Sequence, residues 1–141
     1  MIFDTHAHYD DEDFDGDRQA LLEDLSGAGV RAVTNIGASL SSSRATLELA
    51  ARYPWMYAAI GVHPSDTGEL SEDGIGWLRE AAAGEKVVAI GEIGLDYYWE
   101  EPEHEVQKKW FSRQLALAGE LKLPVVIHSR DAARDTLDMM K

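Results

Sequence analysis

Short apolar segments alternate along the chain with longer polar and mixed stretches. The apolar segments are rich in valine, isoleucine and aromatic residues, and they cover residues 2–3, 30–36, 57–62, 87–90 and 125–127. Segments of this length and composition predict buried strands. The pattern therefore predicts five strands, each separated from the next by enough chain to form a helix.

Helical periodicity fills the intervening stretches. Apolar side chains recur at three- and four-residue steps from Phe14 to Ala28 and from Val106 to Leu121. Serines at positions 41–43 and 71 are suited to cap helices, and Pro124 ends the longest helix just before the fifth strand. The predicted order is five strands alternating with four helices, followed by a final helix over residues 131–141.

This alternation predicts parallel strands joined by right-handed crossovers. A doubly wound sheet and a (β/α) barrel share the order of elements. A doubly wound nucleotide-binding fold is expected to carry a glycine-rich turn after its first strand, but residues 4–8 read Asp-Thr-His-Ala-His. Polar candidates at the carboxyl ends of four strands favour the barrel, because barrel enzymes place their chemistry there.

Composition adds limits to this picture. Apolar residues make up 45% of the chain and charged residues 28%, which is ordinary for a globular protein, and we expect one domain over residues 1–141. The apolar runs are too short to span a bilayer, so a cytoplasmic protein without membrane contact is expected. The absence of cysteine excludes disulfides and thiolate zinc sites, so histidine and carboxylate must hold any metal.

The net charge of −13 argues against a basic surface that binds nucleic acid without specificity, although it does not exclude a nuclease. Much of the acidic excess lies between residues 10 and 17. This run lacks the spacing of a calcium loop, and we interpret it as a solvated loop that leads into a helix.

His6 and His8 flank a single alanine directly after the first strand. A period of two places both imidazoles on one side of an extended segment, where they can form half of a transition-metal site. A chance pair on a surface strand is the alternative. The preceding buried strand and acidic residue favour metal binding.

Glu92 follows an apolar strand, where a carboxylate without a partner is costly to bury. We expect a metal ion to neutralise it, with an ion pair to arginine or lysine as the alternative. Asp96 has either a structural role or an orienting role. The aromatic run at residues 97–99 can stack on bases or pack at the rim of the core, and His104 is expected to be exposed and uninvolved.

His128 ends the fifth apolar segment and is interpreted as a further metal ligand, with a hydrogen-bonded interior histidine as the alternative. His63 ends the third segment and is a candidate for contacting substrate oxygens or donating a proton. Arg130 can bind a substrate phosphate in a bidentate manner, or it can pair with Asp131 or Asp135.

Four motifs together resemble those of the TatD family, in their order and in their spacing. They are Asp-Thr-His-Ala-His at residues 4–8, Gly-Val-His-Pro at 61–64, Gly-Glu-Ile-Gly-Leu-Asp-Tyr-Tyr at 91–98, and Pro-Val-Val-Ile-His-Ser-Arg-Asp-Ala at 124–132. The resemblance implies a TIM barrel of the amidohydrolase superfamily. It also implies a two-metal centre and Mg²⁺-dependent hydrolysis of DNA, commonly as a 3′–5′ exonuclease.

The resemblance assigns roles to individual residues. His6 and His8 are expected to hold one metal, Glu92 to bridge both metals, and His128 to hold the second. Glu92 and His63 are the candidate catalytic residues, while His63 and Arg130 are the candidates for substrate contact. Mg²⁺ is the expected metal, with Mn²⁺ or Zn²⁺ as alternatives.

A complete barrel has eight βα units in about 250 residues, whereas five strands are predicted here. The family's further histidine and catalytic aspartate come from later strands, so at most one metal and impaired activity are expected of this incomplete barrel. Two other readings remain: an amide or ester hydrolase of the same superfamily, and a non-catalytic metal-binding fragment. We also expect self-association through the open edges of the sheet.

Overall fold

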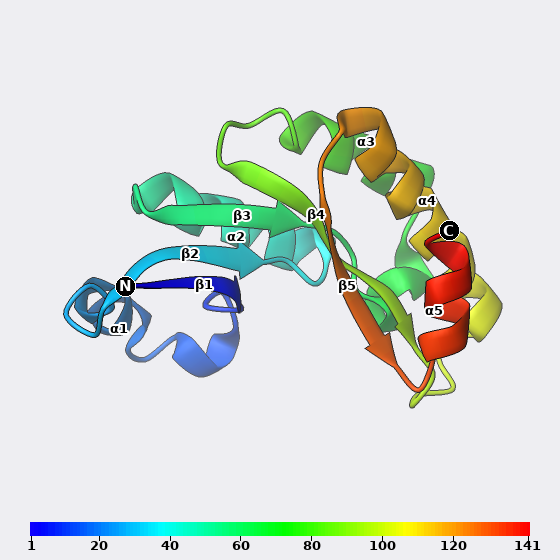
Figure 1. The fold of residues 1–141 in the computed structure, drawn as a ribbon, viewed down its shortest axis with the longest axis horizontal. Coiled ribbons are helices and arrows are strands. Elements are labelled where there is room, and N and C mark those ends of the chain that lie inside the picture. The colour runs from blue at the N-terminus through cyan, green and yellow to red at the C-terminus, as the bar shows by residue number, and fades with distance from the viewer.

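The computed structural model describes all 141 residues. Its strands are β1 (Ile2–Ala7), β2 (Val30–Ile36), β3 (Met56–Ile60), β4 (Val87–Asp96) and β5 (Val125–Arg130) (Figure 1). Its α-helices are α1 (Arg18–Asp24), α2 (Leu40–Arg52), α3 (Glu72–Ala81), α4 (His104–Leu121) and α5 (Ala133–Met139). Two 3₁₀-helices, η1 (Glu12–Phe14) and η2 (Pro64–Glu69), complete the fold.

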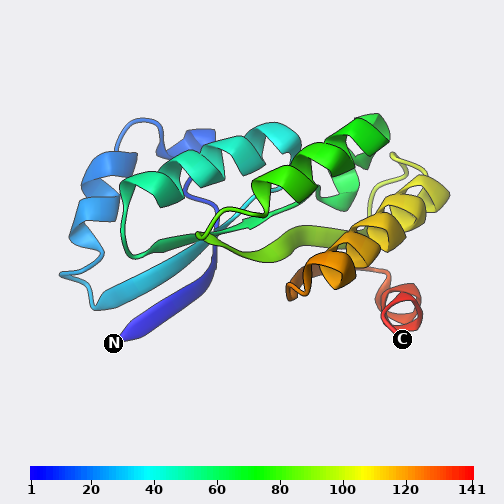
Figure 2. The same cartoon turned by 90° about the horizontal axis from the view of Figure 1, so that it is seen from above.

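All five strands are parallel and lie side by side in the order β1-β2-β3-β4-β5. The sheet is curled, and helices α1 to α4 lie along one side of it (Figure 2). This arrangement confirms the predicted incomplete (β/α) barrel of five βα units. Strands β1 and β5 are the edges of the sheet, so each has one strand neighbour.

The main core lies between the sheet and the helices. Strand residues that point toward the helices, such as Ile60 and Ile90, pack there with Phe111 of α4 and Leu78 of α3. A smaller apolar cluster lies apart from this core and contains Ile36, Ala59 and Ala89. Successive side chains of a strand point to opposite faces, which explains why Ala59 and Ile60 belong to different clusters.

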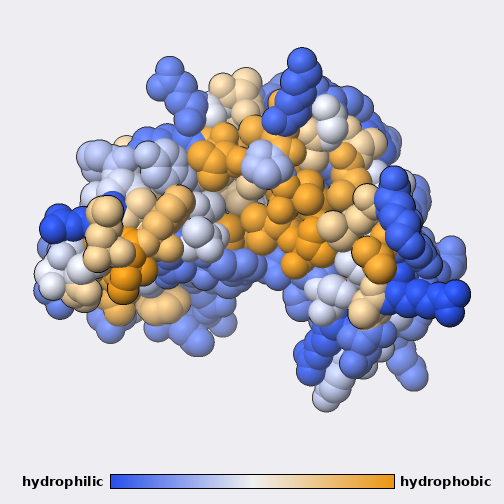
Figure 3. Space-filling model, viewed as in Figure 1, coloured by the Kyte–Doolittle hydropathy of each residue, from blue (hydrophilic) through white to orange (hydrophobic).

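The face of the sheet opposite helices α1 to α4 carries an apolar area at its centre (Figure 3). The edge strands are correspondingly less buried than the pattern predicts. Ile2 and Phe3 of β1 are 53% and 55% exposed, and the apolar residues of β5 are only half-buried. The prediction that all five strands are buried was therefore wrong for β1 and β5, because no further strand or helix covers them.

Three strands extend beyond their apolar segments. Strand β1 runs to Ala7, β4 to Asp96 and β5 to Arg130. The ladder between β4 and β5 pairs Gly94 with His128. Polar residues continue these strands because parallel neighbours satisfy their backbone groups. The sequence pattern placed Glu92 after the fourth strand. In the structure it lies within β4.

Helix boundaries follow local caps. Ser71 caps α3 as predicted, accepting a hydrogen bond from the Gly74 N–H at 3.4 Å. Helix α2 instead begins after Ser39, whose hydroxyl accepts from the Ser42 N–H at 3.0 Å, because Ser39 is the residue with extended backbone. Phe14 lies in η1 outside α1. None of the helices combines the length and the apolar composition needed to cross a bilayer.

Candidate metal centre

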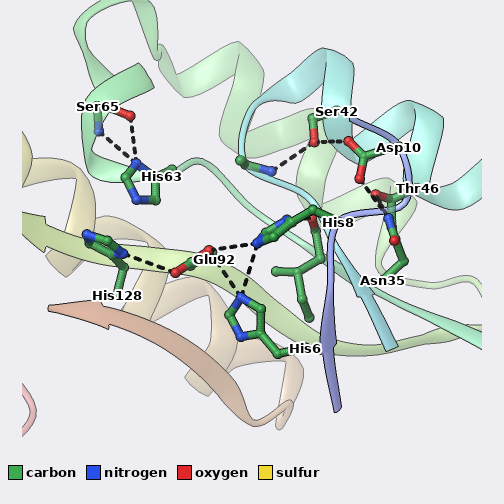
Figure 4. A network of polar contacts seen from close by, with 12 residues as sticks. His6, His8, Asp10, Asn35, Ser42, Thr46, His63, Ser65, Glu92 and His128 are labelled. Atoms are coloured by element: carbon green, nitrogen blue, oxygen red, sulfur yellow. Dashed lines mark hydrogen bonds and ion pairs between the residues drawn. The ribbon is translucent and has the colours of Figure 1, made fainter. Parts of the chain in front are cut away.

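Four histidines and a glutamate meet at the carboxyl end of the sheet (Figure 4). His6 and His8 come from β1 and the residue after it, His63 follows β3, and Glu92 and His128 lie in β4 and β5. They line an open pocket of about 460 Å³, together with Asp10, Asp11, Ala38, Ser42, Ser65 and Asp66. The contributing strands are far apart in sequence, but parallel strands bring their carboxyl ends to one rim of the sheet.

Three of these side chains form a tight triangle. The Nε2 atoms of His6 and His8 are 3.2 Å apart, and Oε2 of Glu92 lies 3.4 Å from the first and 3.5 Å from the second. Ligand atoms about 2.0–2.2 Å from one metal ion, at tetrahedral or octahedral angles, are about 2.8–3.6 Å from each other. The triangle therefore fits a single divalent cation, and the predicted convergence of these three residues is confirmed.

His8 is oriented for this role by a backbone contact. Its Nδ1 lies 2.8 Å from the carbonyl oxygen of Ile36, which can only accept a hydrogen bond, so Nδ1 carries the proton. The lone pair of Nε2 is thereby directed into the triangle, as in metal sites whose histidines donate from their second nitrogen. A hydrogen bond with Glu92 raises the pKa of His8, against the effect of its burial.

Glu92 is 8% exposed and lies between the imidazoles. Its second oxygen, Oε1, is 3.1 Å from Nδ1 of His128, so the two oxygens face different histidines. Burial by itself raises the pKa of Glu92, but hydrogen bonding by His8 and the nearby imidazoles hold that pKa at about 2. No arginine or lysine pairs with this carboxylate, which removes the alternative of an ion pair with those residues.

His128 is held from its other side by Asp96. Nε2 of the ring is 2.9 Å from Oδ2 of Asp96, so this nitrogen donates its proton to the carboxylate. Nδ1 then presents a lone pair to Oε1 of Glu92, a contact that is favourable only with a proton or a cation in between. Asp96 also accepts a hydrogen bond from the Tyr98 N–H at 3.1 Å, so it orients both the loop and the histidine.

His63 lies beside His128, with 4.2 Å between the ring centroids. Its Nδ1 accepts a hydrogen bond from the Ser65 N–H at 3.2 Å, which leaves the proton of the neutral ring on Nε2. Burial lowers the pKa of His63, and the neighbouring His128 lowers it further. A neutral ring with an Nε2–H is suited to donate to an oxygen atom in the pocket.

Asp10 belongs to this site although the sequence interpretation placed it in a solvated loop. Its carboxylate accepts hydrogen bonds from Ser42 at 2.6 Å and from the buried Asn35 amide at 2.8 Å. Asn35 also accepts from the Tyr9 N–H, so the segment after His8 is fastened to β2 and α2. Asp10 lies in a turn after β1, so no periodic pattern in the sequence marks it as part of the site.

Arg130 is exposed and does not line the pocket. Its guanidinium lies 3.8 Å from the ring centre of Tyr98, which is itself exposed. It pairs with neither Asp131 nor Asp135, since Asp135 pairs with Lys108. Its role in substrate binding remains a prediction. His104 is exposed as expected, although it stacks on Tyr97 with 3.8 Å between ring centroids.

Parallel βα units with histidines and a carboxylate clustered at their carboxyl ends define a class, the (β/α)-barrel proteins with a histidine and carboxylate centre. Within that class, the model of the family described as TatD related DNase matches residues 3–141. The chain belongs to the TatD related DNase family.

Individual relatives agree with this assignment. The chain is 40% identical over its full length to YabD of Bacillus subtilis (strain 168), described as an uncharacterized metal-dependent hydrolase, and covers 55% of that protein. It is 37% identical, over 93% of its length, to half of the 3′-5′ ssDNA/RNA exonuclease TatD of Cronobacter sakazakii. The chain thus spans about half the length of the curated relatives it matches.

Solved structures support the same fold. The TatD homologue YjjV of Escherichia coli K12 superposes with a TM-score of 0.87 at 36% identity, over 96% of this chain and 53% of the other. A TatD family hydrolase of Entamoeba histolytica superposes with a TM-score of 0.86 at 25% identity, over 98% of this chain and 52% of the other.

Proposed function

We propose that this chain carries the metal-binding part of a hydrolase that cleaves phosphodiester bonds at the 3′ ends of DNA. The observation that carries the proposal is the triangle of His6, His8 and Glu92, whose ligand atoms are separated by distances that suit one divalent cation. A relative named as an exonuclease of single-stranded DNA and RNA supports the substrate class.

His6, His8 and Glu92 would hold the first metal, and Glu92 and His128 would contribute to a second. A bound divalent ion, expected to be Mg²⁺, would polarise the phosphate and make a bound water more acidic. Glu92 suits the bridging position because its two oxygens face different histidines. Its low pKa keeps it ionised, so it can compensate the charge of a cation throughout the physiological range.

His63 would act on the substrate. Its Nε2–H faces the pocket because Nδ1 is engaged by Ser65, so it can donate a hydrogen bond to a phosphate oxygen or a proton to the leaving oxygen. Asp96 would keep Nε2 of His128 protonated and leave Nδ1 for the metal. Arg130, which is exposed outside the pocket, would contact a phosphate of the substrate beyond the metal centre.

The metal centre can be tested by calorimetric titration of the chain with Mn²⁺ or Zn²⁺. We expect one dominant site, which Glu92→Gln abolishes and His104→Ala leaves intact, because His104 lies outside the pocket. Absence of binding in the unmodified chain, or binding that survives Glu92→Gln unchanged, would contradict the proposal.

The substrate class needs a separate assay. Single-stranded DNA with a labelled end is incubated with the chain and Mg²⁺, and a panel of esters and amides is tested in parallel. Glu92→Gln is the variant expected to lose turnover, and His104→Ala is the control expected to keep it. Release of nucleotides that depends on Glu92 supports a nuclease. Turnover of an ester or amide alone supports the other hydrolase reading, and metal binding with no turnover supports a non-catalytic fragment.

A further inference from the structure

Gln114 of α4 is buried and bonds to the backbone just before His63. Its amide oxygen accepts from the Val62 N–H at 2.8 Å, and its amide nitrogen donates to the Val62 carbonyl at 3.1 Å. Strand β3 ends at Ile60, so Val62 lies beyond the part of the chain that pairs in the sheet. The side chain of Gln114, which is 0% exposed, takes the place of a strand neighbour there.

Gln107 makes the same kind of pair one strand further along the sheet. Its amide oxygen accepts from the Asp96 N–H at 2.8 Å, and its amide nitrogen donates to the Asp96 carbonyl at 3.0 Å. It is 1% exposed and also donates to the carbonyl of Pro102. The side chain of Asp96 in turn holds His128, so Gln107 is connected to that ring through one residue.

The two glutamines lie seven residues apart on one face of α4, about two helical turns. Phe111, which is fully buried, fixes the same part of the helix in the core. A primary amide matches a peptide group with one donor and one acceptor, so each pair is fully satisfied. Leucine at either position would leave two buried backbone groups without partners, and glutamate would set two acceptors against each other at the carbonyl.

We propose that Gln114 and Gln107 are positioning residues, and that α4 uses them to set His63 and His128 separately around Glu92. Gln114 fixes the backbone next to His63, and Gln107 fixes the backbone of Asp96, whose carboxylate accepts a hydrogen bond from the His128 ring. The inference rests on the proposed function in treating this pocket as the active site. Its test, however, observes the rings without metal or substrate.

A purely structural role for the glutamines predicts a different result from a positioning role. If they only satisfy buried backbone groups, replacing either one lowers the stability of the chain and leaves the tautomers and surroundings of His63 and His128 unchanged. If they position the histidines, the effects are local and separable. The distinction can be observed in the ¹⁵N resonances of the histidine side chains, which report the tautomer and the surroundings of each ring.

The experiment records these resonances for the metal-free chain with Gln114→Leu, with Gln107→Leu, and with Leu117→Ala as the control. Leu117 is equally buried on the same helix but contacts no strand end through hydrogen bonds. We expect Gln114→Leu to remove the separation between the Nδ1 and Nε2 signals of His63 while those of His128 remain. Gln107→Leu should instead remove the separation for His128 while the His63 signals remain. Leu117→Ala should shift the signals of neither ring, despite a comparable loss of stability.

Ring signals that shift together in both glutamine variants, or that shift as much in Leu117→Ala, would overturn the proposal. Gln114→Glu and Gln107→Glu provide the test if the leucine variants do not fold, because each keeps the acceptor for the backbone N–H. They should give smaller shifts of the same two rings, and no shift would again overturn the proposal. Failure of the unmodified chain to bind metal would contradict the proposed function without changing this result.

Discussion

Replacing Gly94 by alanine should destabilise the chain and separate His128 from Glu92. Gly94 has φ of +147°, which L-residues rarely adopt. An added Cβ would overlap the carbonyl oxygen of His128 and lie 2.9 Å from its carbonyl carbon. Both atoms belong to backbone of β5, which pairs with Gly94, so no side-chain rotation can relieve the contact.

The expected magnitude follows from two contributions. A residue held in a sparsely populated backbone region costs about 1–3 kcal/mol. Strands β4 and β5 must also move apart before the methyl group reaches an ordinary contact distance, and each weakened ladder hydrogen bond costs about 0.5–1.5 kcal/mol. With two or three such bonds affected, the total is about 2–7 kcal/mol, a large part of the about 5–15 kcal/mol that stabilises a typical domain.

Urea denaturation followed by circular dichroism measures this change, and Gly76→Ala provides the matched control. Gly76 lies inside α3, and a Cβ there meets nothing within 4 Å. The same substitution should therefore stabilise the chain by about 0.5–1 kcal/mol at Gly76, because alanine favours helix. Equal unfolding midpoints for Gly94→Ala and the unmodified chain would refute the described pairing of β4 with β5.

Three further outcomes are expected. Phe111→Ala should lower the free energy of unfolding by about 3–5 kcal/mol, because the ring is fully buried in the main core; a loss below about 1 kcal/mol would show that α4 is packed differently. Protons should compete with the metal at His8 at a higher pH than at a free imidazole, because its pKa is raised by Glu92. Mn²⁺ affinity should then fall steadily between pH 8 and pH 6, and equal affinities at the two pH values would exclude His8 as a ligand. The chain should self-associate at micromolar concentration, since β1 and β5 are open edges and Ile2 and Phe3 are exposed; light scattering that gives a single species of 15.6 kDa would contradict this.

Much of the fold and the candidate site could be predicted from the sequence. Alternating apolar and helical segments fix the order of βα units, because periodicity is a local property of the chain. The same reasoning places polar residues near the carboxyl ends of parallel strands. His6, His8, Glu92 and His128 could thus be selected before any coordinates, and their side chains do converge.

Other features depend on contacts between distant segments. The sequence did not indicate that Asp10 turns back to Asn35 and Ser42, because the acidic run looks the same whether it is solvated or bonded. The protonated nitrogen of His8 is decided by the Ile36 carbonyl, 28 positions away. Such partners are set by how strands and helices pack, and the local pattern carries no information about them.

The sequence by itself determined which strands form, their order, and which side chains can bind a metal. The tertiary structure decided how far β4 extends past its apolar segment, and how Gln107 and Gln114 hold the strand ends that carry the site. The physical reason is that hydrophobic periodicity records the burial of each segment on its own. Ring orientation, protonation and backbone satisfaction are set by single hydrogen bonds between segments that only the folded chain brings together.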